Sequence, residues 1–349
     1  MTAIVAAVET PHARSFEPEL DEFEALASAA GARVVDRVVQ RRDAVDPATL
    51  VGSGKAAEIA ELAKARDAEL LLVFNDLRPR QRKNLERIVP LPIVDRTMLI
   101  LDVFARHARS REGKLQVELA QLRYRQSNLI GVGADLSRLG GGIGTRGPGE
   151  TKLEVDRRRI QERVSVLNRQ LAGVRLQRAV RRASHHRDPL VALVGYTNVG
   201  KSSLLNALAR SDALVADRPF ATLDPTVRRA YLGPHTYARV ADTVGFITDL
   251  PKDLVNAFRA TLEELREADL LVHVLDASNP DWPRQRAAVD ALLHELELDR
   301  TPRLLVFNKC DLLTDEPAQL DGSICVSAVT GAGLGALREA LVARTALPA

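Results

Sequence analysis

Hydrophobic and polar positions along the first 96 residues alternate between two patterns. Apolar runs rich in β-branched residues, each short enough for one strand, occur at 3–8, 34–39, 70–74 and 93–94. Between them lie stretches with helical spacing, such as 19–30. Strand-like runs that alternate with helices are typical of a small α/β layer. We therefore predict an N-terminal α/β subdomain over residues 1–96.

A helical period fills the next part of the chain. Apolar residues recur at spacings of three and four, or sums of them, from 97 to about 125 and again from 150 to about 182. Two long amphipathic helices joined by one loop are expected to fold back on each other. We predict an antiparallel helical hairpin with its linker over residues 97–187.

The segment that would join the two helices, 131–149, holds eight glycines in nineteen residues. A loop of this length in a compact protein is usually functional, and glycine lets a backbone approach a ligand closely. A floppy linker is the alternative. Because the surrounding segment is also basic, we predict RNA contact by this loop. The residues assigned to that contact are Gly140, Gly141, Gly142, Arg146 and Gly149.

A phosphate-binding pattern opens the last part of the chain. The apolar run 190–194 leads into a glycine-rich turn and then into a helical stretch. In such a turn the backbone N–H groups surround phosphates, Lys201 reaches the β and γ phosphates, and the Ser202 hydroxyl ligates Mg²⁺. The predicted phosphate loop comprises Gly195, Tyr196, Thr197, Asn198, Val199, Gly200, Lys201 and Ser202.

The identity of the base is predicted by a second motif, which follows the apolar run 304–307. The Asp311 carboxylate can accept hydrogen bonds from the ring N–H and the exocyclic amine of guanine, whereas adenine offers an acceptor and leaves the carboxylate unpaired. Asn308 is expected to brace the loops, and Lys309 to cover the base. The predicted base pocket comprises Asn308, Lys309, Cys310 and Asp311, with Ser327, Ala328 and Val329 after the run 324–326.

Two further elements are expected to sense the γ phosphate. Asp242 closes the strand-like run 237–241 and should hold Mg²⁺ through water, while the Gly245 N–H bonds the phosphate. Thr222 can close over Mg²⁺ only while that phosphate remains, although Thr226 competes for this role. The assigned residues are Phe220, Ala221, Thr222, Leu223 and Asp224, followed by Asp242, Thr243, Val244 and Gly245. We assign catalysis to Lys201, Thr222 and Gly245, and the metal to Ser202, Thr222 and Asp242.

One position departs from many signalling GTPases. Phe246 stands directly after Gly245, where a glutamine often orients the attacking water. A phenyl ring cannot activate water, so we expect slow intrinsic hydrolysis that a partner accelerates.

Taken in order, these elements predict a GTPase domain over residues 188–349. We expect a mostly parallel six-stranded sheet with helices on both faces, Mg²⁺ as cofactor, and GTP hydrolysis to GDP and phosphate. Two alternatives remain. An ATP-dependent RNA-remodelling protein would explain the phosphate loop and the basic helices but not Asp311. A passive RNA-binding or ribosome-assembly module would use the nucleotide only to stabilise its fold.

Charge separates the two halves of the chain. Residues 1–187 hold 33 Lys and Arg against 24 Asp and Glu, a net +9, and residues 188–349 hold 16 against 22, a net −6. A basic first half suits a polyanionic partner, although solvated helix faces would carry the same charge. The apolar runs are too short to cross a bilayer, and two cysteines make no disulfide framework. We expect a cytoplasmic protein that is monomeric when free.

The sequence resembles the HflX family of ribosome-associated, translation-factor-like GTPases over nearly its whole length. Besides the GTPase elements, the resemblance rests on three segments, 51–55 (VGSGK), 115–122 (LQVELAQL) and 141–152 (GGIGTRGPGETK), and Phe246 is typical of the family. The resemblance implies binding to the large (50S) ribosomal subunit, with the hairpin and its loop reaching ribosomal RNA near the peptidyl-transferase centre. It also implies splitting, rescue or recycling of ribosomes.

The family likeness leaves two features to be interpreted separately. Many bacterial members carry a further C-terminal domain, whereas this sequence ends after one expected helix, 334–343. The segment 51–55 resembles half a phosphate loop but lacks the following Ser or Thr. We interpret it as the start of a helix; a second nucleotide site is the alternative.

Overall fold

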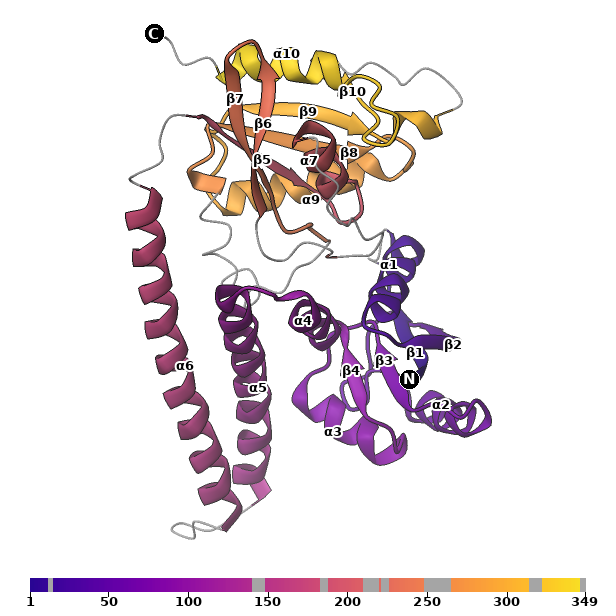
Figure 1. The fold of residues 1–349 in the computed structure, drawn as a ribbon. Coiled ribbons are helices and arrows are strands. Elements are labelled where there is room, and N and C mark those ends of the chain that lie inside the picture. Colours follow the sequence, from indigo (N-terminus) through magenta and orange to yellow (C-terminus); the bar gives the residue numbers. More distant parts are fainter. Residues whose placement is uncertain are drawn as a thin grey trace. The chain divides into compact units, whose positions relative to one another are not determined.

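The computed structural model describes residues 1–11, 15–139, 148–182, 188–209, 220, 226–247, 265–313 and 322–345. Its backbone contacts separate two compact units. The first contains Met1–Arg106 and Lys114–Ala172, and the second contains His107–Gly113 and Gly173–Ala349. The elements of both units are labelled in Figure 1.

The N-terminal part of the first unit is a small parallel α/β layer, as predicted. Its four strands lie in the order β2-β1-β3-β4, and every pair is parallel. The elements are β1 (Thr2–Glu9), α1 (Phe16–Ala29), β2 (Arg33–Arg41), α2 (Ser53–Ala65), β3 (Leu70–Val73), α3 (Pro79–Ile88) and β4 (Ile93–Asp95). The segment 51–55 contains the start of α2, with Gly52 at the N-cap.

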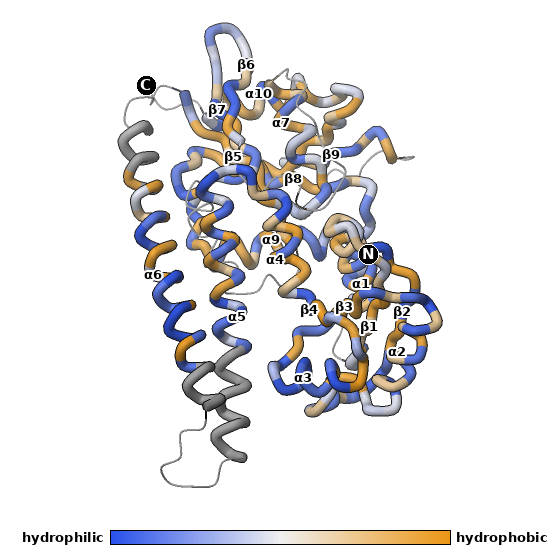
Figure 2. Tube along the Cα trace, turned by 60° about the horizontal axis from the view of Figure 1, so that its bottom comes forward, coloured by the Kyte–Doolittle hydropathy of each residue, from blue (hydrophilic) through white to orange (hydrophobic). Residues whose placement is uncertain are grey.

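Burial explains why β1 and β3, the two inner strands of this sheet, are apolar on both faces. Residues Ile4, Ala6 and Val8 of β1 share one core with α2 and α3. The opposite face packs against α1, where the rings of Phe16 and Phe23 meet Phe74 edge to face at 5.5 and 5.8 Å. A parallel sheet covered on both faces needs near-continuous apolar strands, and Figure 2 shows β1 and β3 coloured accordingly.

Three helices follow the sheet: α4 (Arg96–His107), α5 (Arg111–Leu139) and α6 (Pro148–Arg182). The sequence predicted one helical segment from 97 to about 125, which is wrong, because the chain breaks at 108–110. The Ser110 hydroxyl accepts a hydrogen bond from the Gly113 N–H at 2.9 Å. A side-chain oxygen that satisfies a first-turn N–H starts a new helix.

Helices α5 and α6 lie side by side and run in opposite directions (Figure 1). Glu118 pairs with Arg163 at 2.6 and 2.9 Å, and Gln126 bonds Gln161 at 2.9 Å, so later positions on α5 meet earlier ones on α6. Between the helices lies an apolar seam of Leu115, Leu119, Val164, Leu167 and Leu171. Along each helix, the residues of this seam follow the spacing of three and four from which the two helices are predicted.

The glycine-rich connection is shorter than the sequence suggested. The expected loop 131–149 is wrong at both ends, since 131–139 belong to α5 and Pro148 and Gly149 begin α6. A helical glycine costs only about 1 kcal/mol, too little to end a helix that is already propagating. Proline is favoured in a first turn. Gly140, Gly141, Gly142 and Arg146 lie outside the described residues.

The second unit contains the predicted six-stranded sheet. Its order is β10-β9-β8-β5-β7-β6, and only the β6–β7 pair is antiparallel. The elements are β5 (Leu190–Gly195), α7 (Lys201–Ala209), β6 (Thr226–Gly233), β7 (Thr236–Asp242), β8 (Leu270–Asp276), α9 (Trp282–Glu295), β9 (Arg303–Asn308), the 3₁₀ turn η1 (Cys310–Leu312), β10 (Ile324–Cys325) and α10 (Leu334–Thr345).

Parallel strands bring their carboxyl ends to one edge of a sheet, where α/β proteins bind ligands. Here that edge carries the ends of β5, β7, β8 and β9, each followed by a predicted site motif or a polar residue.

Within the described ranges, no helix has the length and apolar character to span a bilayer.

Candidate nucleotide site

The loop after β5 can be built only with glycine at two positions. Gly195 has φ +155°, and a Cβ there would lie 2.3 Å from the carbonyl oxygen of Val274. Gly200 has φ +87°, and its Cβ would lie 2.3 Å from Nδ2 of Asn308. A positive φ disfavours any residue with a Cβ, and the neighbouring atoms of Val274 and Asn308 leave no space for a Cβ at either glycine. The backbone between these two glycines therefore makes a tight turn that leads into α7.

Lys201, the first residue of α7, is buried beneath this loop. Its Nζ donates to the carbonyl oxygens of Gly195 at 3.0 Å and Tyr196 at 2.7 Å. Burial lowers the pKa of Lys201 to about 8, and the nearby Asp242 carboxylate partly opposes that shift. A phosphate placed over the loop would add negative charge beside this amine and stabilise its charged form.

A hydroxyl and a carboxylate meet next to the lysine. The Ser202 hydroxyl donates to Oδ2 of Asp242 at 2.5 Å, and Asp242 is 2 % exposed at the end of β7. Thr243, the next residue, is anchored by a 2.6 Å hydrogen bond from its hydroxyl to the carbonyl oxygen of Leu193. Hydroxyl and carboxylate oxygens are the donors that Mg²⁺ prefers, so this pair fits the predicted metal.

Gly245 and Phe246 lie against the phosphate loop. A Cβ on Gly245 would lie 2.9 Å from Cα and Cγ2 of Thr197 and 3.2 Å from Nζ of Lys201. The Phe246 N–H donates to the carbonyl oxygen of Gly195 at 3.1 Å, and the Thr197 N–H donates to the carbonyl oxygen of Phe246 at 2.8 Å. The Phe246 side chain is 2 % exposed. This two-bond bridge holds Gly245 beside Lys201.

Asn308, at the end of β9, ties the base side of the site to the phosphate side. Its Nδ2 donates to the carbonyl oxygen of Val199 at 2.9 Å, and its Oδ1 accepts from the Ala328 N–H at 3.1 Å. One buried amide thus joins the phosphate loop, the end of β9 and the loop after β10. A buried amide whose donor and acceptor are both used fixes the separation of the segments that it joins.

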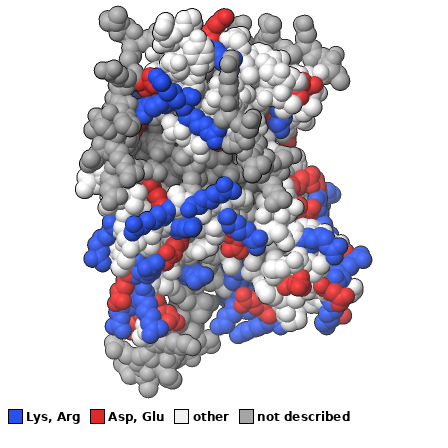
Figure 3. All heavy atoms as spheres, in the orientation of Figure 1, with Lys and Arg blue, Asp and Glu red and all other residues white. Residues whose placement is uncertain are grey.

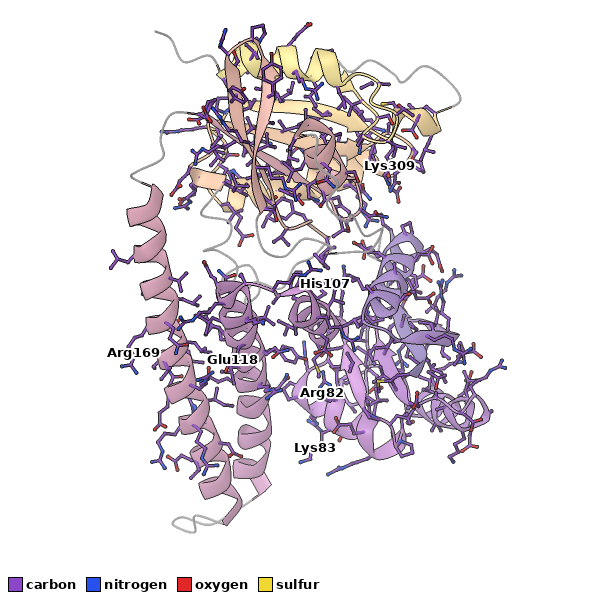
Figure 4. All side chains as sticks on the ribbon, in the orientation of Figure 1. Arg82, Lys83, His107, Glu118, Arg169 and Lys309 are labelled. Atoms are coloured by element: carbon purple, nitrogen blue, oxygen red, sulfur yellow. The ribbon has the colours of Figure 1, made fainter. Side chains whose placement is uncertain are left out.

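The next residue, Lys309, stands in the left-handed region at φ +63°. Its Nζ pairs with Oδ2 of Asp276 at 2.7 Å, and Figure 4 labels this side chain on the second unit. Asp276 was not predicted from the sequence. Its signal was available, because it is a carboxylate directly after an apolar strand-like run, the position that Asp242 also occupies.

The remaining predicted residues divide between buried and exposed positions. Asp311 is exposed in η1, and Val329 is 86 % exposed, whereas Ser327 is buried and its hydroxyl accepts from the Thr330 N–H at 3.0 Å. Phe220 is buried with φ +56°. Thr226, the alternative to Thr222, is the exposed first residue of β6. Ala221, Thr222, Leu223 and Asp224 lie outside the described residues.

Comparison with known proteins relates this arrangement to a family. Residues 17–105, 107–185 and 190–309 match three family models, described in turn as the GTP-binding GTPase N-terminal domain, the GTP-binding GTPase middle region and the 50S ribosome-binding GTPase. The GTPase HflX of Caldanaerobacter subterraneus is 47% identical over 340 residues, which cover 97% of this chain and 79% of that protein. The chain belongs to the HflX family. The resemblance inferred from the motifs is thereby confirmed.

Other comparisons agree with this assignment. The GTPase HflX of Escherichia coli is 46% identical over 335 residues, 93% of this chain and 79% of that protein. A GTP-binding protein from the archaeon Sulfolobus solfataricus, solved with GDP, has the same fold at 22% identity, with a TM-score of 0.50 and 99% of each chain covered. As an HflX GTPase, the protein binds GTP and GDP and hydrolyses GTP. The loop 195–200, Lys201 and the carboxyl-end edge of the six-stranded sheet are therefore the candidate nucleotide site of a GTPase.

Proposed function

We propose that this HflX-family GTPase binds the large (50S) ribosomal subunit and couples GTP hydrolysis to the splitting, rescue or recycling of ribosomes. The observation that carries the proposal is the match of residues 190–309 to the 50S ribosome-binding GTPase model, in a chain that also presents a basic helical hairpin. We further propose that it works in the cytoplasm as a monomer when it is not bound to the subunit.

Hydrolysis would use groups that the fold has already positioned. Lys201 and the Gly245 N–H would stabilise negative charge on the γ phosphate as it transfers to water, a contribution that is largest in a buried site. Ser202, Asp242 through water, and Thr222 would hold Mg²⁺, which neutralises phosphate charge. With Phe246 buried and unable to activate water, we propose slow hydrolysis until the ribosome completes the site.

Selection of guanine is assigned to Asp311, with Asn308 and Lys309 shaping the pocket and Ser327, Ala328 and Val329 completing it. Support comes from the bonds of Asn308 to the loops on either side of it. Adenine would leave the carboxylate unpaired. GDP and ADP affinities measured on the same preparation test this assignment, and comparable values would favour the ATP-dependent RNA-remodelling alternative.

The hairpin is assigned to ribosomal RNA. Figure 3 shows Lys and Arg side chains spread over the described surface of the first unit, and Arg157, Arg158 and Arg159 of α6 are all exposed. Guanidinium groups on a solvent face attract phosphates over long range. Gly140, Gly141, Gly142, Arg146 and Gly149 are proposed to approach the RNA at the tip. Shortening 140–147 should weaken co-sedimentation with large subunits; unchanged binding and splitting would refute the role given to the tip.

One experiment tests the function as a whole. We expect GTP turnover by the full chain to rise at least tenfold when purified large subunits are added, and ATP turnover to remain at background. A passive RNA-binding or assembly module would show no rise. The Lys201→Ala variant is the control for contaminating hydrolases, since turnover that survives this change does not come from the described site.

A further inference from the structure

A cavity of about 570 Å³ opens in the first unit, and none of the residues that line it belongs to the candidate nucleotide site. Three of its walls are helix stripes with a spacing of three and four residues, which places their side chains on one face. Helix α4 contributes Met98, Leu101 and Asp102, and α5 contributes Gln121, Tyr124, Arg125 and Asn128. Helix α6 contributes Asp156, Arg159 and Ile160. We call this cavity the three-helix pocket.

A buried polar cluster fixes the aromatic wall of the three-helix pocket. From α3, Arg82 donates to the Tyr124 hydroxyl at 2.9 Å, to Oδ2 of Asp95 at 2.5 Å and to the carbonyl oxygen of Ile93 at 2.6 Å. Tyr124 also donates to Asp95, which is 1 % exposed. Figure 4 shows Arg82 directed from α3 toward α5. Two of these four hydrogen bonds are made by the Tyr124 hydroxyl, and the other two fix its partner Arg82, so the cluster holds the Tyr124 ring in one orientation.

The ionised groups of the three-helix pocket are not paired with one another. Within the described ranges, no hydrogen bond or ion pair is made by Arg125, Asp156 or Arg159. Asp102 interacts with Arg106 and Arg125 through their charges, without a hydrogen bond. Partial burial raises the pKa of Asp102. On an ordinary helix surface, neighbouring opposite charges tend to form close pairs. Here two carboxylates and two guanidiniums remain available around an apolar floor of Met98, Leu101 and Ile160.

The composition of this pocket defines the chemistry of a ligand. A fixed aromatic ring and apolar floor suit the face of a planar heterocycle, and side-chain amides and carboxylates suit its exocyclic amines and ring nitrogens. Guanidiniums at the rim suit a phosphate. The volume is within the range of small-ligand sites. A base can reach such a pocket only when it is unstacked and unpaired.

We propose that the three-helix pocket binds one unpaired nucleotide of an RNA partner, with the base against Tyr124 and its phosphate between Arg125 and Arg159. This inference rests on the RNA partner assigned under the proposed function. It adds a contact to a base in a pocket lined by α3, α4, α5 and α6, whereas surface arginines contact phosphates without regard to sequence.

The test compares two double variants of the full-length, GDP-loaded protein. Arg125→Gln with Arg159→Gln removes the rim cations, and Arg123→Gln with Arg158→Gln removes two cations from the same two helices outside the pocket. The probe is a short single-stranded RNA with one central 2-aminopurine, whose fluorescence reports the surroundings of that base. We expect the pocket variant to bind about tenfold more weakly than the matched control, the size of about one lost hydrogen bond between a guanidinium and a phosphate. Equal losses would overturn the proposal, because they indicate general phosphate attraction.

A charge-neutral variant separates the pocket from its electrostatics. Met98→Trp fills the cavity, so we expect it to abolish the change in 2-aminopurine fluorescence while leaving GDP affinity unchanged. Unaltered fluorescence would overturn the proposal. So would equal binding of the same strand in a duplex, or complete displacement of the RNA by equimolar adenosine monophosphate, which would identify a free nucleotide as the ligand. Co-sedimentation with large subunits is measured in parallel, because its loss with intact oligonucleotide binding would refute the proposed function alone.

Discussion

Two segments of this protein combine glycine and lysine at the start of a helix, and only one of them is a phosphate loop. In the first unit, Gly52 and Gly54 open α2, and Lys55 forms a surface ion pair with Glu58 at 2.6 Å. A Cβ on Gly54 would meet nothing within 4 Å. In the second unit, Gly195 and Gly200 have positive φ and no room for a Cβ, and Lys201 is buried.

The difference shows that glycine and lysine at the start of a helix do not by themselves make a phosphate loop, and that the backbone conformation decides. A phosphate loop needs the backbone to turn its N–H groups inward, which requires left-handed glycines and close neighbours. The segment 51–55 starts a helix with ordinary backbone angles, in agreement with its interpretation as a helix start that lacks the following Ser or Thr. Four predictions, each with its measurement, follow from the largest expected effect to the smallest.

Replacing the lysine should separate the two segments most strongly. We expect Lys201→Ala to lower kcat for GTP on the order of 10² to 10³-fold, because a buried cation next to the transferring phosphate is lost. GDP affinity should fall with it. Lys55→Ala is the matched control, and its solvated ion pair with Glu58 predicts a change of less than about 0.5 kcal/mol in the free energy of unfolding. Steady-state hydrolysis measures kcat for both variants, and chemical denaturation measures their free energies of unfolding. Similar hydrolysis rates in the two variants would contradict the assignment.

Replacing a glycine of the second segment comes next. Gly200→Ala places a Cβ against Asn308 in a left-handed conformation, a strain of about 1–3 kcal/mol. We expect GDP affinity to fall about tenfold or more, as measured by titration with a fluorescent GDP analogue. Because Asn308 also joins the loop after β10, the selectivity for GDP over ADP should narrow as well. Wild-type affinity would show that the loop can relax without cost.

A buried histidine in the second unit gives a smaller, pH-dependent effect. Burial, Arg303, Arg286 and Lys201 lower the pKa of His273 on β8 to about 3 from an ordinary value of 6.5. Below pH 6.5 the unfolded chain gains a proton that the folded chain does not, so stability falls as the pH is lowered toward 3. Between pH 7 and pH 5 this residue should remove about 2 kcal/mol.

The control for that prediction is a second histidine. His273→Gln should flatten the loss of stability between pH 7 and pH 5, whereas His294→Gln, at a side chain that is 81 % exposed, should keep the wild-type slope. Urea denaturation at each pH gives the free energy of unfolding. Equal slopes in the two variants would mean that His273 takes up its proton in the folded protein.

The smallest effect belongs to the first segment. Gly54→Ala adds a methyl group to an open position in the first turn of α2, where alanine favours the helix. We expect a gain of about 0.5 kcal/mol in stability and no change in GDP affinity. Thermal denaturation measures the first and nucleotide titration the second. A loss of stability would mean that the α2 start depends on glycine after all.

Regular patterns made most of the fold predictable from the sequence. Apolar runs located the strands because parallel sheets bury both faces, and heptad-like spacing located the seam of the hairpin. The break at 108–110 was missed because a single serine cap carries little signal among charged residues. Helical glycines at 131–139 were taken for a loop, since composition does not show how far a helix propagates once it has started.

The gathering of the predicted motifs at one edge of the sheet was predictable, because the motifs follow the ends of parallel strands along the chain. Contacts between motifs were less so: nothing in the sequence pairs Asn308 with Val199 or Lys309 with Asp276. The three-helix pocket was not foreseen at all, because Arg82, Asp95 and Tyr124 come from three separate elements and belong to no motif. Such clusters form only after packing has brought distant helices together.

The two hydrogen bonds between Phe246 and the phosphate loop give the enzyme a fixed pivot. Gly245 cannot move away from Lys201 unless these two hydrogen bonds break, so the Phe246 backbone couples any movement of Gly245 to the loop 195–200. These two hydrogen bonds break less often because the Phe246 ring, which is buried, would have to leave the core at the same time. The residue after Gly245 therefore contributes two backbone hydrogen bonds to the loop 195–200 and a buried ring to the core, so its position is fixed from both sides.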